Sequence, residues 1–371
     1  MKSVIHAWEI RGLINVSRQT KDTIKRLFRE NYGSCRKAFQ ALQLRERTAY
    51  EFLGKSKSFT TLAKFFALTD GLGISREKVE IYIEKFRDRK RQRRSYCVNF
   101  PFTYSPLVLR SVAHIPGDGY VSKNGCTKWI QKEPRFMVML LRKLLTTTQR
   151  PSGPQVTIPR FLVSVNCLKL QITPNELKSP RFIDAVMELP RRYRAQTLFA
   201  LIVDEGNIDV KGNISIRMKK RDLVEAYAKL CDSLGYDRSH VIKIQNNGTF
   251  GRSYLWKFRI RAGGIRGLYG DYMDALATFG RVGGLWGKDQ KFMERCQTAL
   301  NRKATKDAEG REITKASLTL LSKHGELNVH EICNLLGSDS YDRIYDRIRY
   351  LRKRGKIKRV SYGRYALNQP F

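Results

Sequence analysis

The sequence predicts an α+β protein in which two related αββαββ segments lie between an all-helical region and a C-terminal region of helices and a hairpin. Three observations predict this fold. The early part of the chain has helical apolar spacing, an acid-glycine step recurs in the middle, and the last part reads as three helices and a hairpin. We expect domains at 1–95, 96–190, 191–300 and 308–371, which 371 residues can accommodate.

The chain is strongly basic. It has 71 Lys and Arg against 34 Asp and Glu, a formal net charge of +37. Such self-repulsion favours a polyanionic partner, so we expect double-stranded DNA, with RNA as an alternative. No window has the roughly 18 apolar residues of a membrane span, and the N-terminus lacks a secretory core. We therefore expect no membrane partner and a cytoplasmic, nucleoid-associated monomer containing an internal pseudo-dimer.

Cysteine and histidine are dispersed along the chain. The seven cysteines form no C-x-x-C pair, and none of the five histidines stands at metal-ligand spacing from them. This pattern disfavours a zinc site and a histidine-metal nuclease. We therefore look for chemistry among carboxylates and lysines.

Residues 18 to 84 are predicted to be helical, with a short turn at Leu44-Arg45. Three helices are marked by Ala38, Phe39 and Leu42, by Ala49, Phe52 and Leu53, and by Leu62, Phe65, Phe66 and Leu68. The arrangement resembles the helix-turn-helix of Cro-type repressors, which implies that Arg45 and Arg47 face DNA. A plain helical bundle with a solvated basic face is the alternative. The basic run "KFRDRKRQRRSY" from Lys85 is interpreted as a linker or charged helix end.

The C-terminal segment reads as helix, helix, helix and hairpin. Ile344, Ile348 and Leu351 recur at helical spacing, and Tyr362-Gly363 is predicted to turn the hairpin. This order resembles a winged helix. The resemblance implies DNA contacts from the third helix and from the wing, through Arg343, Arg347, Lys358 and Arg364. Winged helices also bind proteins, and that alternative stays open.

The middle of the chain is an internal repeat. "LRSVAHIPGDGYV" aligns with "QTLFALIVDEGNI", which places Asp118 opposite Glu205, each before a glycine. "NCLKLQI" (166–172) then aligns with "YLWKFRI" (254–260), which places Lys169 opposite Lys257. The acid and the lysine are 51 positions apart in one copy and 52 in the other. In each copy a hairpin and a helix lie between the acid and the lysine, so each copy is predicted to have the order αββαββ.

The paired segments "HIPGDG" and "LIVDEG" resemble the signature helices of the LAGLIDADG homing-endonuclease family in its single-chain, two-repeat form, over roughly residues 100–285. The resemblance implies a pseudo-twofold β-saddle over duplex DNA and association with introns or inteins. It also implies Mg²⁺-dependent (or Mn²⁺-dependent) endonuclease activity in which Asp118 and Glu205 hold the metal. Lys169 and Lys257, each expected on a strand, would stabilise the phosphate or order the attacking water. A solvated strand lysine is the alternative for both.

The strands should supply the DNA-binding face. In "NIDVKGNISIRM" apolar and polar residues alternate, so one face packs on helices and the other stays free for the major groove. The expected DNA contacts from the strands are Lys123, Lys128, Lys211, Arg217, Lys219 and Arg259.

Two residues depart from the family pattern. Pro116 should end the first helix early, and Asp204 occupies a position where a small residue usually packs. Asp204 is thus a possible metal ligand in place of Glu205, although the register with Asp118-Gly119 favours Glu205. The rival function is a non-cleaving DNA-binding transcriptional regulator, or an RNA maturase, on the same fold.

Overall fold

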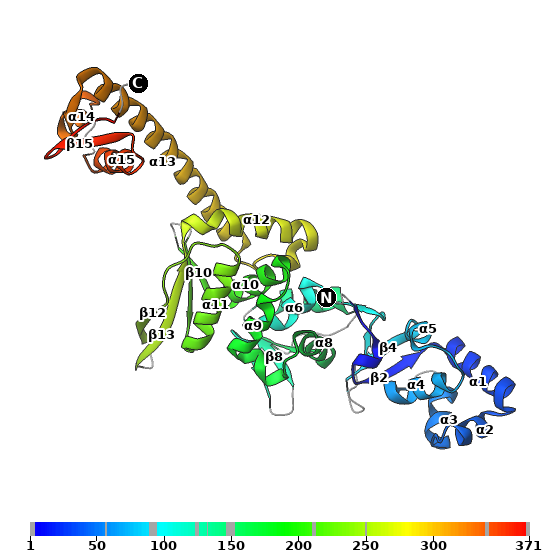
Figure 1. The fold of residues 1–371 in the computed structure, drawn as a ribbon. Coiled ribbons are helices and arrows are strands. Elements are labelled where there is room, and N and C mark those ends of the chain that lie inside the picture. The colour runs from blue at the N-terminus through cyan, green and yellow to red at the C-terminus, as the bar shows by residue number, and fades with distance from the viewer. Residues whose placement is uncertain are drawn as a thin grey trace. The chain divides into compact units, whose positions relative to one another are not determined.

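The computed structural model describes residues 4–55, 58–88, 95–122, 126–131, 133–145, 153–209, 213–248, 251–337 and 341–368. The chain divides into two compact units, Met1–Cys296 and Gln297–Phe371. Helices are mixed with several small antiparallel sheets (Figure 1), which confirms the predicted α+β class. In the described part of the chain, no helix is both long enough and apolar enough to cross a membrane.

The N-terminal part contains the three predicted helices, and it also contains strands. Its helices are η1 (Ala7–Glu9), α1 (Arg18–Tyr32), α2 (Cys35–Ala41), α3 (Glu46–Gly54), α4 (Leu62–Asp70) and α5 (Arg76–Glu80). Its strands are β1 (Val4–Ile5), β2 (Leu13–Val16), β3 (Thr60–Thr61), β4 (Ile83–Arg87) and β5 (Tyr96–Cys97). All but β1 form one sheet in the order β3-β2-β4-β5, so the prediction of an all-helical region is wrong.

The missed strands have a physical explanation. In β4 the buried residues Ile83 and Phe86 are three positions apart, a helical spacing, because the register shifts between Asn15 and Val16 of the paired strand β2. This bulge conceals the alternation that marks a strand. The first residues of the basic run thus belong to β4, and positions 89–94 lie outside the described residues.

The first repeat begins at α6 and has a three-stranded sheet in the order β7-β8-β9. Strand β6 (Phe102–Thr103) precedes it and pairs with β1. The elements are α6 (Pro106–Ala113), β7 (Gly119–Val121), β8 (Thr127–Ile130), α7 (Arg135–Leu144), β9 (Gln155–Ile158), α8 (Arg160–Leu170), η2 (Pro174–Lys178) and α9 (Pro180–Met187).

The second repeat has a four-stranded sheet in the order β10-β11-β13-β12. Its elements are α10 (Arg191–Glu205), β10 (Gly206–Ile208), β11 (Ile214–Met218), α11 (Arg221–Ser233), β12 (Ile242–Gly248), β13 (Gly251–Ile260), α12 (Ala262–Phe279) and η3 (Gly280–Gly283). Helices α6 and α10 pack against each other (Figure 1), which joins the two repeats in one core.

The strand registers give a structural alignment of the repeats. Gly119 pairs with Trp129 as Gly206 pairs with Ile216. Continuing across each sheet, Ile130 pairs with Gln155 as Arg217 pairs with Lys257. Strand β9 therefore corresponds to β13, and Gln155 is the counterpart of Lys257.

The prediction that Lys169 lies on a strand is wrong. Residues 166–170 belong to α8, and the described first repeat runs αββαβ before that helix, without a counterpart of β12 among its described residues. A seven-residue apolar segment fits either periodicity, and α8 is stabilised by burying Phe161, Leu162 and Val165.

The second unit confirms the predicted order of helices and hairpin. It comprises most of α13 (Asp289–His324), then β14 (Glu326–Asn328), α14 (Val329–Leu335), α15 (Tyr341–Lys353), β15 (Ile357–Ser361) and β16 (Arg364–Leu367), with sheet order β14-β16-β15. Ile344, Ile348 and Leu351 enter its core as predicted. Gly363, with φ of 73°, follows Tyr362 in the turn between β15 and β16.

Candidate active site at the ends of two packed helices

The acids Asp118 and Glu205 occupy equivalent positions in the two repeats: Asp118 ends the turns that follow α6, and Glu205 is the last residue of α10. In each copy the next residue is a glycine that begins a strand, and a side chain there would collide with the backbone of the residue four positions earlier, Ile115 or Ile202. The helices nevertheless end differently. Helix α6 stops at Ala113 and continues as turns because Pro116 has no N–H to donate, whereas α10 extends to Glu205.

The two half-buried acids lie close enough to influence each other. Burial and then the charge of Asp204 raise the pKa of Asp118 to about 6. Burial and then the charge of Asp118 raise the pKa of Glu205 to about 7. Both carboxyls thus bind protons more tightly than isolated side chains, because their negative charges converge in a partly desolvated site.

Asp204 has a different environment, because its side chain is fully buried. His114 Nδ1 lies 3.0 and 3.1 Å from the two carboxylate oxygens, and Trp129 Nε1 donates a hydrogen bond of 3.3 Å to Oδ1. The backbone N–H of Asp118 donates to the same carboxylate. Burial raises the pKa of Asp204 and lowers that of His114, so the pair is kept near neutral.

Asp204 also occupies the contact between the two helix ends. A Cβ placed on Gly117 would lie 2.8 Å from the Asp204 Cβ, so glycine at 117 makes room for the larger residue opposite it. His114 stacks on Trp286 with ring centroids 4.3 Å apart, which closes the other side. Asp204 therefore holds the helix ends together and is enclosed by protein, whereas Asp118 and Glu205 remain partly accessible.

Two lysines that were not predicted from the sequence, Lys288 and Lys178, bind backbone carbonyl groups next to the two acids. Lys288 Nζ donates to the carbonyl oxygens of Ile202 (2.8 Å) and Gly206 (2.6 Å). Lys178 Nζ donates to the carbonyl oxygen of Gly119 at 2.6 Å. In each repeat, the carbonyl oxygen of the glycine after the acid thus accepts a hydrogen bond from a lysine ammonium group. The charge of Lys288 lowers the pKa values of both Asp118 and Glu205, and Lys178 lowers that of Asp118.

Neither missed lysine has a clear sequence signal. Lys178 is the last residue of η2, which follows α8, and Lys288 lies after η3, which follows α12. Both lysines therefore lie outside the sequence segments that align between the two repeats. Gln131 was also missed, and its Nε2 donates to Asp118 Oδ2. The Glu205 carboxylate accepts no hydrogen bond from any residue that the structure describes.

The lysines predicted to be catalytic are placed elsewhere. Lys169 Nζ lies 5.7 Å from the Tyr104 ring centroid, and the charge acting on its pKa is that of Glu9. Lys257 lies on β13 opposite Arg217, and burial together with the charges of Arg259 and Arg217 lowers its pKa. Neither Asp118 nor Glu205 is among the charges that shift the pKa of either lysine.

Lys257 belongs to a basic face of the second sheet. Along β11 and β13 the residues of this face alternate with fully buried ones such as Ile216 and Phe258, although Lys257 itself is only 8% exposed. Arg217, Lys219 and Arg259 are exposed there, as the alternation predicts. In the first sheet Lys128 is half-buried and donates to Gln155 at 3.3 Å. Lys123 and Lys211 lie outside the described residues.

The basic residues predicted to bind DNA in the terminal regions are mostly on the surface. Arg45 and Arg47 are exposed, and Arg47 pairs with Glu51 on α3 at 3.5 Å. In the second unit Arg343 and Lys358 are exposed. Two others make internal contacts, since Arg347 lies 5.2 Å from the Tyr350 ring centroid and Arg364 donates to Glu331 at 3.0 Å.

The acid pair fits a magnesium ion better than it fits a metal held wholly by protein. Among the described residues, His, Cys, Asp and Glu side chains form no group of three or more suited to a metal. Mg²⁺ usually takes one or two carboxylates and completes its shell with water and phosphate oxygens. Asp118 and Glu205 supply two such carboxylates, and their raised pKa values indicate a site where added positive charge is favourable.

No protein-family model matches the sequence, and no curated protein matches it.

Proposed function

We propose that this chain is a site-specific double-stranded DNA endonuclease of the LAGLIDADG type. The observation that carries the proposal is the convergence of Asp118 and Glu205 from equivalent positions at the ends of two packed helices, where the charge of Asp118 raises the pKa of Glu205. Two carboxylates placed in this way suit phosphodiester hydrolysis, in which a divalent cation is shared between paired acids.

Each residue of the site would have a separate role. Asp118 and Glu205 would hold Mg²⁺ or Mn²⁺, which neutralises charge on the scissile phosphate and lowers the pKa of water. Lys178 and Lys288 fix the backbone that carries the two acids. Gln131 orients the Asp118 carboxylate. The backbone at both acids and the carboxylate of Asp118 are therefore held in place before DNA arrives, and electrostatic preorganisation of this kind is usually the largest contribution to transition-state stabilisation.

The basic sheet face supplies binding to the duplex. The exposed Arg217 and Arg259 lie on neighbouring strands beside the nearly buried Lys257, and positive side chains spaced along strands suit phosphate and base-edge contacts in a major groove. The proposed saddle places this sheet and its three-stranded counterpart on the two halves of one long site. The net charge of +37 supports a polyanion of that length.

A binding selection followed by a cleavage assay tests the proposal. Duplexes selected from a random pool should be cut in Mg²⁺ or Mn²⁺. Asp118→Asn and Glu205→Gln should each reduce the cleavage rate by about a thousandfold or more and change affinity less than about threefold, because they remove metal ligands and no phosphate contact. Asp184→Asn, an exposed acid on α9, is the matched control and should cut normally.

The second candidate is a DNA-binding regulator that does not cleave. It is favoured by Lys288, which already places a positive charge beside both acids, and by Gln155, which stands where a symmetric site would have a second lysine. Tight binding of the selected duplex with no cleavage in either metal would establish this candidate and refute the nuclease. Preference for structured RNA over duplex DNA at matched salt would instead favour an RNA maturase.

A further inference from the structure

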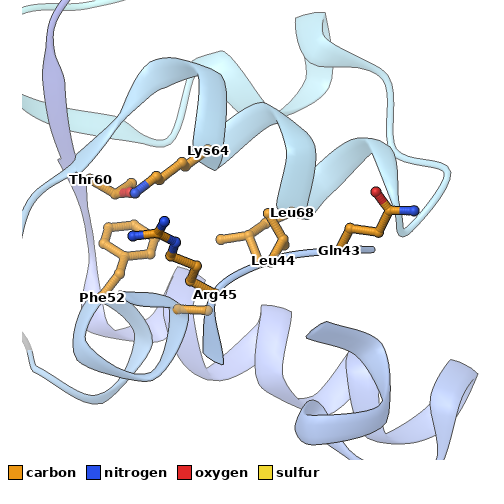
Figure 2. Close-up of a pocket in the computed structure, with 8 residues that line it drawn as sticks. Gln43, Leu44, Arg45, Phe52, Thr60, Lys64 and Leu68 are labelled. Atoms are coloured by element: carbon orange, nitrogen blue, oxygen red, sulfur yellow. The ribbon is translucent and has the colours of Figure 1, made fainter. Parts of the chain in front are cut away.

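A pocket of about 300 Å³ lies in the N-terminal part, between α3 and α4 (Figure 2). Its walls are mainly apolar and include Leu44, Phe52 and Leu68. Thr60, at the start of β3, adds a hydroxyl group. This volume is at the lower end of the range for small-molecule sites, in which a few polar groups typically orient a ligand against apolar walls.

Two cations border this pocket. Arg45 precedes the first turn of α3, and Lys64 belongs to the first turns of α4. Figure 2 shows both side chains extending toward the end of the pocket where Thr60 and Phe52 lie. Each is exposed, and among the described residues neither makes a side-chain hydrogen bond or an ion pair.

The acids near this pocket are already paired with other residues. Glu46 pairs with Arg36 at 3.4 Å, and Glu51 pairs with Arg47 at 3.5 Å. No carboxylate is among the residues that line the pocket. The pocket therefore combines apolar walls with positive charge that its own lining does not neutralise.

We propose that this pocket binds a small organic anion, a carboxylate or a phosphate monoester carried on a compact apolar or aromatic body. The guanidinium of Arg45 and the ammonium of Lys64 bind the anionic group through charge-assisted hydrogen bonds. The apolar body covers Leu44, Phe52 and Leu68 and removes their surface from water. A bare anion can bind the two cations but cannot cover the apolar walls, and a neutral aromatic molecule can cover the walls but cannot bind the cations.

Ligand-observed NMR titration of the full chain tests this proposal. The probes are phenyl phosphate and benzoate for the two anion types, inorganic phosphate without an apolar body, and benzyl alcohol without a charge. We expect saturable binding of phenyl phosphate, benzoate or both, with inorganic phosphate and benzyl alcohol at least about tenfold weaker. Arg45→Gln and Lys64→Gln should each weaken the binding of the anionic probe by about tenfold.

Controls separate the pocket from the general basicity of the chain. Lys37→Gln, which removes an exposed charge on α2, should leave probe affinity unchanged. Ala49→Leu should block binding by filling the pocket, with circular dichroism confirming the fold. The proposal is overturned if neither anionic probe saturates, if inorganic phosphate or benzyl alcohol binds as tightly as the anionic aromatics, or if Lys37→Gln weakens binding as much as Arg45→Gln.

Discussion

The two repeats of the first unit hold the backbone next to their acids in the same way, but the helices and strands around the acids differ. In both, a glycine follows the acid and its carbonyl oxygen accepts a hydrogen bond from a lysine. In the first repeat the helix ends at Ala113, three residues before Pro116, the described sheet has three strands, and Gln155 lies opposite Ile130. In the second, α10 runs through to Glu205, the sheet has four strands, and Lys257 occupies the corresponding position.

This comparison separates the features that position the two acids, which both repeats share, from the features around the acids, which differ. The glycine after each acid and the lysine that binds its carbonyl group are shared, so they are the minimum needed to hold a carboxylate at a helix end. Asp204 and Gly117 occupy equivalent positions and are opposite in size, and each is suited to the other. The two halves are therefore complementary at this contact, so a substitution in one half should change the effect of a substitution in the other.

The largest expected effect is at the contact between Gly117 and Asp204. Gly117→Ala places a Cβ 2.8 Å from the Asp204 Cβ and should lower the free energy of unfolding by about 1–3 kcal/mol through overpacking. Asp204→Ala leaves the buried Trp129 Nε1 donor and His114 Nδ1 without their hydrogen-bond partner and should cost about 3 kcal/mol. The double variant should cost less than the sum by at least about 1 kcal/mol, because removing Asp204 relieves the collision.

Urea denaturation followed by tryptophan fluorescence measures this coupling. All four tryptophans lie in the first unit, so the signal reports that unit alone. Gly270→Ala, in α12 where a Cβ meets open space, is the control and should be neutral or stabilising. Strict additivity of the two single variants would contradict a direct contact between the helix ends.

The two carbonyl-binding lysines should differ in their contribution to stability. Lys288→Met removes the donor to the Gly206 carbonyl group and one of the two donors to that of Ile202, and it removes positive charge from beside Asp118, Asp204 and Glu205, so it should cost about 2–3 kcal/mol. Lys178→Met leaves one such carbonyl group and should cost about 1 kcal/mol. The same denaturation assay measures both, and equal losses would show that the two halves are supported alike.

The acid pair should make stability fall as pH rises. The folded pKa values of Asp118 and Glu205 are raised to about 6 and about 7, from ordinary values of 3.8 and 4.5. Between about pH 4 and pH 7 the folded chain therefore holds protons that the unfolded chain has released, and this stabilising contribution is lost as pH rises through the folded values.

Denaturation midpoints at pH 5, 6 and 7 measure this slope. Asp118→Asn and Glu205→Gln should each make it shallower, and Mg²⁺ should stabilise the native protein at pH 7 more than at pH 5 because protons and cation compete for the same oxygens. A slope that is unchanged in both variants would show that the two acids do not form a coupled pair.

The sequence predicted the parts of this site that depend on local pattern. An acid before glycine at the end of an apolar helix recurs in the chain, so Asp118 and Glu205 could be found by alignment. Lys178 and Lys288 could not, because each lysine reaches a backbone carbonyl through tertiary packing that leaves no periodic trace. The α+β class and the C-terminal order follow from periodicity, whereas the bulge in β4, opposite Asn15 and Val16 of β2, concealed the N-terminal sheet. Lys169 was misplaced because its short apolar segment fits both a helix and a strand.

The smallest expected effect concerns the two lysines that the sequence alignment paired. Lys257 lies beside Arg217 and Arg259 on the basic sheet face but is only 8% exposed, so Lys257→Gln should remove at most one phosphate contact and reduce the slope of log K against log salt by no more than about 0.9. Lys169 lies on α8 beside Tyr104 and Glu9, so Lys169→Gln should leave that slope unchanged. Salt titrations of the two variants on the same duplex separate them. Equal reductions would mean that the first repeat contacts DNA through α8, and the strand-based saddle would have to be abandoned for that half.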